Sequence, residues 1–539
     1  MTMPVADSVT DAGVDATALS DRFTMRLIDY FDRGAELDPE RACLIMGGTA
    51  QTYREVQDRS HRIARALIDT DFARGAKAAV VSPNCAAAFE CVLGILRAEG
   101  VWVKVNFRNA VAENASVLDQ LDTAVLFFHS SLADQVAQFR DLCPKMRTYV
   151  CIDGTVADSI CLEEWIRDVR GTAPERGSRS DTLATLTSTG GTTGRPKGVM
   201  ASNLTWQIFI GNFHACFPLR DPQVHLVVAP MAHAAGSFAL IMTAAGATNI
   251  ILPRFDAEAV MAAIQQYRVT TLFLPPTAIY TMLSHPKVRE FDYSSLQYFF
   301  YTAAPMSVAK LREAIDVFGP IMTTMFGQVE APATCTYLPP WELVENGVVN
   351  EKRLASCGRP SLHTRVAIMD DNGKLLSEGQ KGEIVVRGNL VMRGYYQNAQ
   401  ATEEASRFGW HHTGDIGYLD EEGYLFIVDR KKDMIISGGF NIYSAEVEQV
   451  LAHHPAVQEC AVIGVPDEKW GEAVRAVVEL KSGQSVSEIE LIDFAKEKLG
   501  SIKAPKGVEF WTSLPRSIAG KVLKAEIRAK YWAHADRRI

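Results

Sequence analysis

The chain has 539 residues, of which 47% are hydrophobic and 22% are charged, as is typical of a globular protein with two or more folded units. Its formal net charge of -9 argues against a general affinity for nucleic acid or anionic membranes. The ten cysteines include no Cys-x-x-Cys pair, so neither a zinc site nor a disulfide framework is indicated. We therefore expect a cytoplasmic protein with reduced thiols.

Residues 1–22 contain four aspartates and no early basic cluster, which predicts a disordered leader rather than a secretion signal. After a short hairpin at 42–53, apolar strands alternate with helical segments, and this pattern indicates parallel sheets covered by helices on both faces. We expect strands at 78–82, 101–105, 123–128, 224–228, 248–252 and 271–274. Helices are expected at 23–34, 53–69, 86–99, 111–121, 257–266 and 308–318.

One segment could be mistaken for a membrane span, because residues 222–253 contain no Asp, Glu, Lys or Arg. A span needs about 20 consecutive apolar residues, whereas His225, Pro230, His233 and Gly236 interrupt the first half of this run. We therefore predict a buried strand, helix and strand here, and no integral membrane segment.

The pattern changes after about Cys357, where short strands separated by turns predict a mostly antiparallel, β-rich subdomain at about 357–428. Its strands are expected at 364–369, 382–386 and 424–428. From Ser444 onward we expect a small α+β unit, with strands at 457–464 and 474–480 and helices at 444–451, 487–499 and after Lys521. The charged run Asp429–Lys432, interpreted as a solvated turn, is the predicted junction.

The predicted fold class is therefore α/β. A large N-terminal domain at 23–431 has parallel-type sheets covered by helices and includes the β-rich subdomain. A small α+β domain at 432–539 follows it.

The stretch TSTGGTTGRPK at Thr187–Lys197 has three glycines and five hydroxyl side chains in its first eight residues. Glycine N–H groups, hydroxyls and one lysine suit a polyphosphate, but a solvated turn or linker has the same composition. The stretch is not a Walker A loop, because Arg195 and Pro196 separate Gly194 from Lys197, and it contains no Gly-x-Gly-x-x-Gly fingerprint. The stretch alone leaves both interpretations open.

Five motifs together resemble the adenylate-forming enzymes, which include acyl- and aryl-CoA synthetases, peptide-synthetase adenylation domains and beetle luciferases. They are TSTGGTTGRPKGVM, YTAAP at 301–305, FGQVE at 326–330, HTGDIGYLDEEGYLFIVDRKKDMIISGGFNIYSAEVE at 412–448 and PRSIAGKVLK at 515–524. The resemblance covers nearly the whole chain. It implies that the small C-terminal domain is mobile and rotates between two half-reactions. An acyl adenylate forms first from a carboxylic acid and Mg-ATP, and a thiol, most often that of coenzyme A, then takes the acyl group.

The resemblance implies a site for the phosphates and for Mg²⁺. Glu330 matches the family's Mg²⁺-associated glutamate, and its hard oxygens suit a cation that bridges phosphates. Thr192 is expected near the same ion. The expected phosphate-binding residues are Thr189, Gly190, Gly191, Thr192, Thr193, Gly194 and Lys197, with Gly190 in place of the usual serine.

The nucleoside is expected in a flat apolar slot. By resemblance, one wall comprises Ala303, Ala304 and Pro305. Phe326 supplies the other wall, beside Gly327, where many relatives carry Tyr. Asp415 matches the residue that accepts from both ribose hydroxyls, and Arg430 matches the one that also reaches the ribose.

The expected catalytic residues are Lys521, Glu330 and His233. Lys521 matches the C-terminal lysine that bridges the acid and the α-phosphate when the small domain closes. His233 matches a gate beside the acyl pocket. Possible pocket residues are Trp206, Phe209, His233, Ala234, Ala235 and Gly236, and the small size of the last three implies room for a bulky apolar acyl group.

Lys432 falls at the family's hinge position. The expected path for coenzyme A includes Ser437, Gly438, Gly439 and Trp470, where glycines leave a channel for the pantetheine arm. Ile436 stands where many relatives have Lys and Ser444 where many have Pro, so the sequence departs from the family pattern in this part of the chain.

The leading hypothesis is an ATP-dependent ligase that joins a hydrophobic carboxylic acid, either aromatic, arylalkanoic or medium-chain, to coenzyme A. The alternatives are an adenylating enzyme that loads a carrier-protein thiol, a luciferase-like oxygenase and an inactive nucleotide sensor. Expected ligands are ATP, Mg²⁺, coenzyme A and the acid, which the sequence does not identify. No nucleic-acid partner is expected, and a homodimer is the expected assembly.

Overall fold

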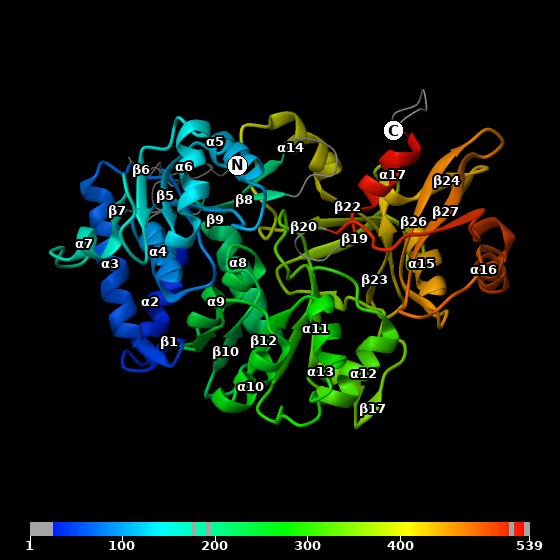
Figure 1. Ribbon diagram of the computed structural model, residues 1–539, viewed down its shortest axis with the longest axis horizontal. Coiled ribbons are helices and arrows are strands. Elements are labelled where there is room, and N and C mark those ends of the chain that lie inside the picture. The colour runs from blue at the N-terminus through cyan, green and yellow to red at the C-terminus, as the bar shows by residue number, and fades with distance from the viewer. Residues whose placement is uncertain (1–24, 175–178, 180, 190–195, 517–521, 533–539) are drawn as a thin grey trace, which may run out of the picture.

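Two large, mainly parallel sheets form the body of the molecule in the computed structural model, which describes residues 25–174, 179, 181–189, 196–516 and 522–532 (Figure 1). The first sheet has the order β21-β9-β8-β4-β3-β5-β6-β7. Its strands are β3 (Lys77–Val81), β4 (Val101–Lys104), β5 (Thr123–Phe128), β6 (Thr148–Cys151), β7 (Ile160–Cys161), β8 (Leu183–Thr189), β9 (Lys197–Ser202) and β21 (Gly394–Tyr395). The neighbouring helices are α3 (Tyr53–Asp69), α4 (Ala86–Arg97), α5 (Val111–Gln120), α6 (Ala133–Leu142) and α7 (Leu162–Ile166).

The second sheet has the order β18-β15-β14-β13-β12-β10-β11-β1-β2. Its strands are β1 (Ala42–Met46), β2 (Thr49–Thr52), β10 (Val224–Val227), β11 (Thr248–Ile251), β12 (Thr271–Leu274), β13 (Tyr298–Tyr301), β14 (Met322–Phe326), β15 (Thr336–Leu338) and β18 (Arg359–Pro360). Its helices are α2 (Leu27–Leu37), α8 (Asn203–Cys216), α9 (Ala234–Thr243), α10 (Ala257–Tyr267), α11 (Pro276–Leu283), α12 (Val308–Phe318) and α13 (Pro340–Leu343). A small ladder pairs β16 (Val344–Glu345) with β17 (Val348–Val349).

Local chemistry explains several of these elements. Helix α3 begins with a capping box, in which Thr52 accepts from the Glu55 N–H and the Glu55 side chain accepts from the Thr52 N–H. Strands β4, β12 and β13 are buried along their whole length, as expected where helices cover both faces of a parallel sheet. One hydrophobic core contains Phe127 of the first sheet and Phe300 of the second, so the two sheets are packed together through the helices between them.

The uncharged run at 222–253 folds as predicted into a strand, a helix and a strand, namely β10, α9 and β11. Within the described ranges, we find no helix with both the length and the apolar character needed to cross a bilayer. All ten cysteines lie in these ranges and are free thiols.

The predicted β-rich region contains an antiparallel sheet with the order β19-β20-β22-β23. Its strands are β19 (Arg365–Met369), β20 (Gly382–Arg387), β22 (His411–Leu419) and β23 (Leu425–Arg430), and helix α14 (Ala399–Ala405) precedes β22. The short strands β18 and β21 of the same region join the two large sheets instead. Because β23 runs to Arg430 and Asp429 is buried, the solvated turn predicted at 429–432 is wrong for these two residues.

The C-terminal part forms a sheet with the order β25-β24-β27-β26, to which β28 adds parallel to β27. Its elements are β24 (Ile435–Ser437), β25 (Phe440–Ile442), α15 (Ser444–Ala452), β26 (Val457–Asp467), β27 (Gly471–Leu480), α16 (Glu488–Lys503), β28 (Gly507–Phe510) and α17 (Lys524–Trp532). In Figure 1 these elements lie at the side of the β19-β20-β22-β23 sheet that is away from the first large sheet. The predicted fold class is therefore confirmed: an α/β protein with a small C-terminal α+β domain.

Some predicted features lie outside the described residues. They are the leader at 1–22, residues 190–194 of the glycine loop and Lys521. The predicted boundary at 431/432 and the rotation of the small domain remain predictions.

Candidate active site

The glycine loop connects two paired strands. Strands β8 and β9 are antiparallel, and Thr189 pairs with Lys197, so the flanks of the loop are the two strands of a hairpin in the first sheet. The described flanks, Thr189 and Lys197, therefore lie side by side in the sheet. Lys197 points back over the sheet, with its Nζ 4.8 Å from the ring centroid of Tyr395.

Tyr395 joins two residues that the sequence predicts separately. Its hydroxyl donates to Oε1 of Glu330 at 2.9 Å, while its ring lies under Lys197. Burial, followed by the negative charge of Glu330, raises the pKa of Tyr395, so it stays a hydrogen-bond donor. The sequence analysis missed Tyr395, because a two-residue strand has no recognisable pattern and only its pairing with β9 brings it here.

Glu330 is suited to a magnesium ion that also binds phosphate. It is partly exposed, and Tyr395 holds one carboxylate oxygen. Magnesium is commonly held by one or two carboxylates together with substrate phosphates. Within the part of the chain that is described, no group of three or more His, Cys, Asp and Glu side chains is arranged to hold a metal ion, so Glu330 fits a shared ion better than a complete protein site.

The predicted ribose pair is formed across two neighbouring strands. Asp415 of β22 lies opposite Arg430 of β23, and Arg430 Nε is 3.1 Å from Asp415 Oδ1. Gln328 Nε2 donates to Oδ2 of Asp415 at 2.8 Å and to the Thr413 carbonyl at 2.7 Å. Gln328 was not predicted, and it lies two residues before Glu330, so one short segment connects the ribose pair with the candidate metal ligand.

The two predicted adenine walls lie at the same edge of the second sheet. Strands β13 and β14 are parallel neighbours; Ala303, Ala304 and Pro305 follow the first, and Phe326 ends the second. Ala303 has a φ of 73°, a region that residues with a Cβ rarely adopt and that often occurs at functional sites. Phe326 is only 7% exposed and belongs to the hydrophobic core. At Gly327 a Cβ would lie 2.3 Å from the Ala333 nitrogen, so only glycine fits.

His233 is the N-cap residue of α9. Its side chain is open to solvent but has protein on most sides. These surroundings, followed by the positive charge of Lys104, lower its pKa to about 4. The imidazole is therefore neutral near pH 7.

The structure explains the small size of Gly236, after His233, by close packing and not by room for an acyl group. A Cβ on Gly236 would lie 1.9 Å from the carbonyl oxygen of Met231, and Ala235 is 2% exposed in the core. Gly236 is thus required by the close approach of the Met231 carbonyl, so its size is no evidence for room in an acyl pocket.

The predicted pocket walls on α8 are buried. Trp206 and Phe209 are 4% and 3% exposed, with ring centroids 5.7 Å apart. The indole Nε1 of Trp206 donates to Thr185 Oγ1 at 3.1 Å. On its other side Trp206 contacts Lys104, a buried cation that the sequence analysis did not single out.

The predicted coenzyme A residues form a hairpin in the C-terminal sheet. Ser437 pairs with Phe440, so Gly438 and Gly439 are the whole loop, and their φ values of 58° and 82° are the positive values that such a two-residue turn requires. The Gly438 N–H donates to the Trp470 carbonyl at 2.8 Å. A Cβ on Gly438 would lie 2.6 Å from the Trp470 ring, so these two predicted residues are in direct contact.

A hydrogen-bonded network connects the end of β23 with the C-terminal helices. Ser444 donates to Asp429 Oδ2 at 2.9 Å and accepts from Lys524 Nζ at 2.7 Å, and Lys524 also pairs with Glu448 at 2.7 Å. Lys432, the predicted hinge residue, lies in the short helical turn that follows β23. Ser444, which stands at a usual proline position, therefore links the two sides of the predicted junction.

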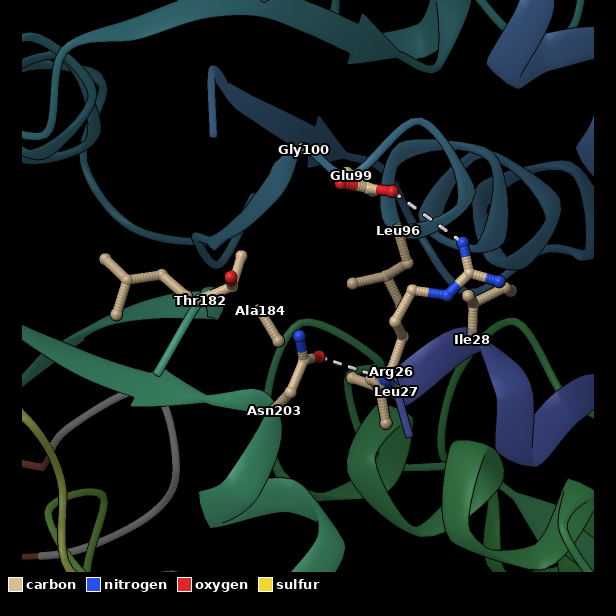
Figure 2. A pocket seen from close by; sticks show the side chains of 10 residues that line it. Arg26, Leu27, Ile28, Leu96, Glu99, Gly100, Thr182, Ala184 and Asn203 are labelled. Carbon is tan, nitrogen blue, oxygen red and sulfur yellow. Dashed lines mark hydrogen bonds and ion pairs between the residues drawn. The ribbon is translucent and has the colours of Figure 1, made fainter. Parts of the chain in front are cut away.

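A small cavity lies away from all of these residues, where the start of α2 meets the end of α4 and the start of α8 (Figure 2). Arg26 faces Glu99 across it at 3.8 Å, and the Leu27 N–H donates to Asn203 Oδ1 at 3.0 Å. These contacts fix α2 on the body, and no predicted site residue lines the cavity.

Known proteins are similar to this chain in sequence and in fold. A profile of the AMP-binding enzyme family matches residues 31–396, and a profile of the AMP-binding enzyme C-terminal domain matches 446–521. Medium/long-chain-fatty-acid–CoA ligase FadD8 of Mycobacterium tuberculosis is 41% identical over 368 residues, which are 67% of this chain and 63% of that protein. A feruloyl-CoA synthase of an Amycolatopsis species is 36% identical over 503 residues, 93% of this chain and 98% of that one.

Among solved structures, ATP-bound MatB from Rhodopseudomonas palustris matches with a TM-score of 0.85 at 27% identity, over 94% of this chain and 99% of MatB. The match to FadD8 spans less than two thirds of that protein, whereas each of the other two matches spans nearly the whole length of both chains. The predicted resemblance is therefore confirmed: the chain belongs to the AMP-binding enzyme family and is an AMP-forming acid–thiol ligase.

Proposed function

We propose that the protein activates a hydrophobic carboxylic acid, either aromatic, arylalkanoic or medium-chain, as an acyl-AMP and transfers the acyl group to coenzyme A. The observation that carries this proposal is the connected set Lys197–Tyr395–Glu330 and Gln328–Asp415–Arg430. These contacts support the proposal because they connect Lys197 with Glu330, the candidate metal ligand, and connect Gln328, two residues before Glu330, with Asp415, the carboxylate expected to bind the ribose. The acid–CoA ligases among the relatives support the choice of acceptor.

Charge neutralisation is the main task of such a site. A carboxylate that attacks the α-phosphorus of ATP brings two anions together, so the protein must offset their charge and hold them in line. Lys197 and the glycine-loop backbone would bind the β- and γ-phosphates. Glu330 and Thr192 would hold a Mg²⁺ ion, which would neutralise phosphate charge when bound.

The nucleoside and the acid are assigned to different groups of residues. Asp415 would accept from the ribose hydroxyls, and Arg430 keeps that carboxylate oriented through the contact at 3.1 Å. His233, which is neutral at pH 7, would orient the acid without adding a charge of its own. Lys521 would arrive from the C-terminal domain and stabilise the charge that develops during adenylation.

The second half-reaction is assigned to the hairpin at Ser437–Phe440 and to Trp470. Because Gly438 has no side chain, its backbone can lie against the Trp470 ring. Since 43% of Trp470 is exposed, the ring would be available to the pantetheine arm after rotation of the C-terminal domain. A carrier-protein thiol is the alternative acceptor, because it presents the same pantetheine group.

The test is a screen for pyrophosphate release from Mg-ATP with aryl, arylalkanoic, medium-chain and steroid-like acids, with reactions lacking acid as the control. We expect release that depends on one class of hydrophobic acid, and AMP formation that continues on addition of free coenzyme A. Turnover with a phosphopantetheinylated carrier protein but not with coenzyme A would favour the alternative. ATP binding without release for any acid would identify a nucleotide sensor and overturn the proposal.

A further inference from the structure

A buried lysine at the end of β4 takes no part in the predicted nucleotide site. Lys104 is 6% exposed, and its Nζ donates to Ser237 Oγ at 2.8 Å. No Asp or Glu among the described residues forms an ion pair with it. Burying a cation without an anion is costly, and burial lowers the pKa of Lys104 to about 7. Such a residue needs a reason to be there.

The surroundings of Lys104 supply donors and aromatic faces but few acceptors. Its Nζ is 4.7 Å from the ring centroid of Trp102 and 5.8 Å from that of Trp206, and these faces attract a cation without accepting a conventional hydrogen bond. Trp102 is two residues earlier on the same face of β4. Its Nε1 is buried and has no hydrogen-bond partner among the described residues, whereas Trp206 Nε1 is satisfied by Thr185.

Of these two buried donors, only Lys104 has an acceptor recorded among the described residues, the Ser237 hydroxyl. Buried donors in folded proteins are almost always satisfied, and an ammonium has three N–H bonds to place. The described part of the chain supplies no acceptor for Trp102 Nε1 and a single hydrogen-bond acceptor for Lys104.

This cluster lies beside the candidate acid site. Ser237 comes four residues after His233 on α9, and residues at this spacing share a helix face about 5.4 Å apart along the axis. The Ser237 N–H donates to the His233 carbonyl at 3.4 Å, and Lys104 donates to the Ser237 side chain, so Lys104 lies about one helical turn from His233. The charge of Lys104 accordingly contributes to the low pKa of His233. Trp206, a predicted pocket wall, closes the other side. His233 is exposed whereas Ser237 is 7% exposed. Lys104, which donates to Ser237, therefore lies at the inner end of the candidate acid site.

We propose that Lys104, assisted by Trp102, binds an oxygen acceptor on the acyl part of the substrate, at the end away from the reacting carboxylate. This inference rests on the proposed function and narrows it to an otherwise apolar acid with a carbonyl, phenol, ether or second carboxylate oxygen. A charge-assisted hydrogen bond at a buried position is strong. An acid without that oxygen leaves both donors unsatisfied and is rejected more strongly than loss of contact area would produce.

The experiment measures kcat/KM for pyrophosphate release with matched pairs of acids. Each pair differs only at the distal end: 4-hydroxyphenyl against phenyl, oxo against methylene, and a dicarboxylic acid against the monocarboxylic acid of the same length. We expect at least one pair for which the wild type prefers the oxygen-bearing acid by about 10- to 100-fold. The pair with the largest preference separates a neutral acceptor from an anionic one.

Lys104→Met should reduce this preference by about tenfold or more. The apolar acid should gain in kcat/KM, because it no longer covers an unpaired cation. Trp102→Phe keeps an aromatic ring and removes the N–H donor together with the pyrrole part of the indole, and it should reduce the preference by a smaller factor. It also keeps the test informative if Lys104→Met fails to fold. The matched control is Lys77→Met at the start of β3, where the lysine lies 5.0 Å from the Tyr396 ring, and it should leave the preference unchanged.

Three outcomes would overturn the inference. One is a wild type that activates both members of every pair equally well. Another is a Lys104→Met variant, shown by thermal unfolding to be folded, that loses activity equally with both members, since the lysine would then support the reacting carboxylate or the fold. The last is an unchanged preference in Trp102→Phe and Lys104→Met together. Activity without a preference contradicts this inference alone. If none of the acids gives pyrophosphate release, that result contradicts the proposed function as well.

Discussion

Removing the charge of Lys524 should destabilise the C-terminal domain by an amount that depends on pH. Lys524 on α17 is 2.7 Å from Glu448 of α15, and 17% and 21% of these two side chains are exposed. Burial lowers the pKa of Lys524, but the attraction and hydrogen bond of Glu448, together with the charges of Asp429 and Asp433, outweigh it and the pKa is raised overall. In Lys524→Met the side chain keeps much of its apolar stem, while Glu448 loses its cation.

The magnitude follows from what remains around Glu448. Breaking a fully buried ion pair by removing one partner costs about 3–5 kcal/mol. Here Glu448 still accepts from the Val462 N–H at 2.6 Å, and water reaches the 21% of its side chain that is exposed. We therefore expect a loss of about 2–3 kcal/mol in the free energy of opening the C-terminal domain.

Hydrogen–deuterium exchange of peptides from β26 and β27 measures this loss directly, because their amides exchange when the domain opens. A loss of about 2–3 kcal/mol corresponds to exchange that is about 30- to 140-fold faster, at about 1.4 kcal/mol for each factor of ten. Lys498→Met is the matched control: Lys498 is 52% exposed on α16, and its loss should change the free energy by less than about 0.5 kcal/mol.

The pH dependence tests the cause. Burial raises the pKa of Glu448 above its usual value, and loss of Lys524 should raise it further. A carboxyl group with a higher pKa in the folded state binds more protons there, so stability falls as the pH rises from the unfolded to the folded pKa. The difference between Lys524→Met and the wild type should therefore be larger at about pH 8 than at about pH 5. Equal differences at both pH values, or exchange within twofold of the wild type at about pH 8, would refute the reasoning.

Three further variants test the proposed mechanism. Lys521→Ala should abolish acyl-AMP formation but retain thioester formation from supplied acyl-AMP; equal loss of both steps would contradict a two-conformation mechanism. Tyr395→Phe removes the hydrogen bond to Glu330 and keeps the ring beside Lys197, so kcat/KM for adenylation should fall about 10- to 100-fold with a higher Mg²⁺ requirement, and an unchanged Mg²⁺ dependence would exclude this role. Trp470→Ala should raise the KM for coenzyme A and spare pyrophosphate release, and a loss confined to adenylation would place Trp470 elsewhere.

The structure also changes how the thiol path is best tested. The sequence suggests a bulky residue at Gly438 as a way to block the predicted coenzyme A path. Its φ of 58° and the 2.6 Å approach of a Cβ to Trp470 mean that such a substitution would distort the hairpin itself. Trp470→Ala removes the exposed ring and leaves the two-glycine turn intact.

Local pattern determined most of the secondary structure. Strands β5 and β12 and helices α3 and α12 have the bounds that the sequence predicts, because their apolar positions repeat with a clear period and a cap or turn residue marks each start. Errors lie at the ends of elements, in very short strands and in longer elements that were not predicted, among them α6, α8, β13 and β14. Helix α4 stops at Arg97, two residues before the predicted end, and β18 and β21, each only two residues long, were not predicted.

The order of the motifs along the chain was enough to identify the enzyme family, because that identification depends on the residue types in five stretches and not on their positions in space. Contacts between distant segments could not be read in the same way. Gln328 meets Asp415 across 87 residues, Tyr395 meets Glu330 across 65, and Lys104 meets Ser237 across 133. No periodic pattern encodes such pairs, since they arise only when separate strands and helices pack together.

The sequence by itself therefore determined the family and the reaction class, an AMP-forming ligation of an acid to a thiol. It also predicted a glycine loop, a magnesium-binding carboxylate and a C-terminal lysine as the groups that carry out this reaction. The tertiary structure decided which side chains support that chemistry. It showed that Gly236 is small because the Met231 carbonyl lies against it, and it brought Lys104, which has no ion-pair partner among the described residues, close to the candidate acid site. The physical reason is burial, because the cost of a buried cation or of a 1.9 Å contact exists only after the chain has folded.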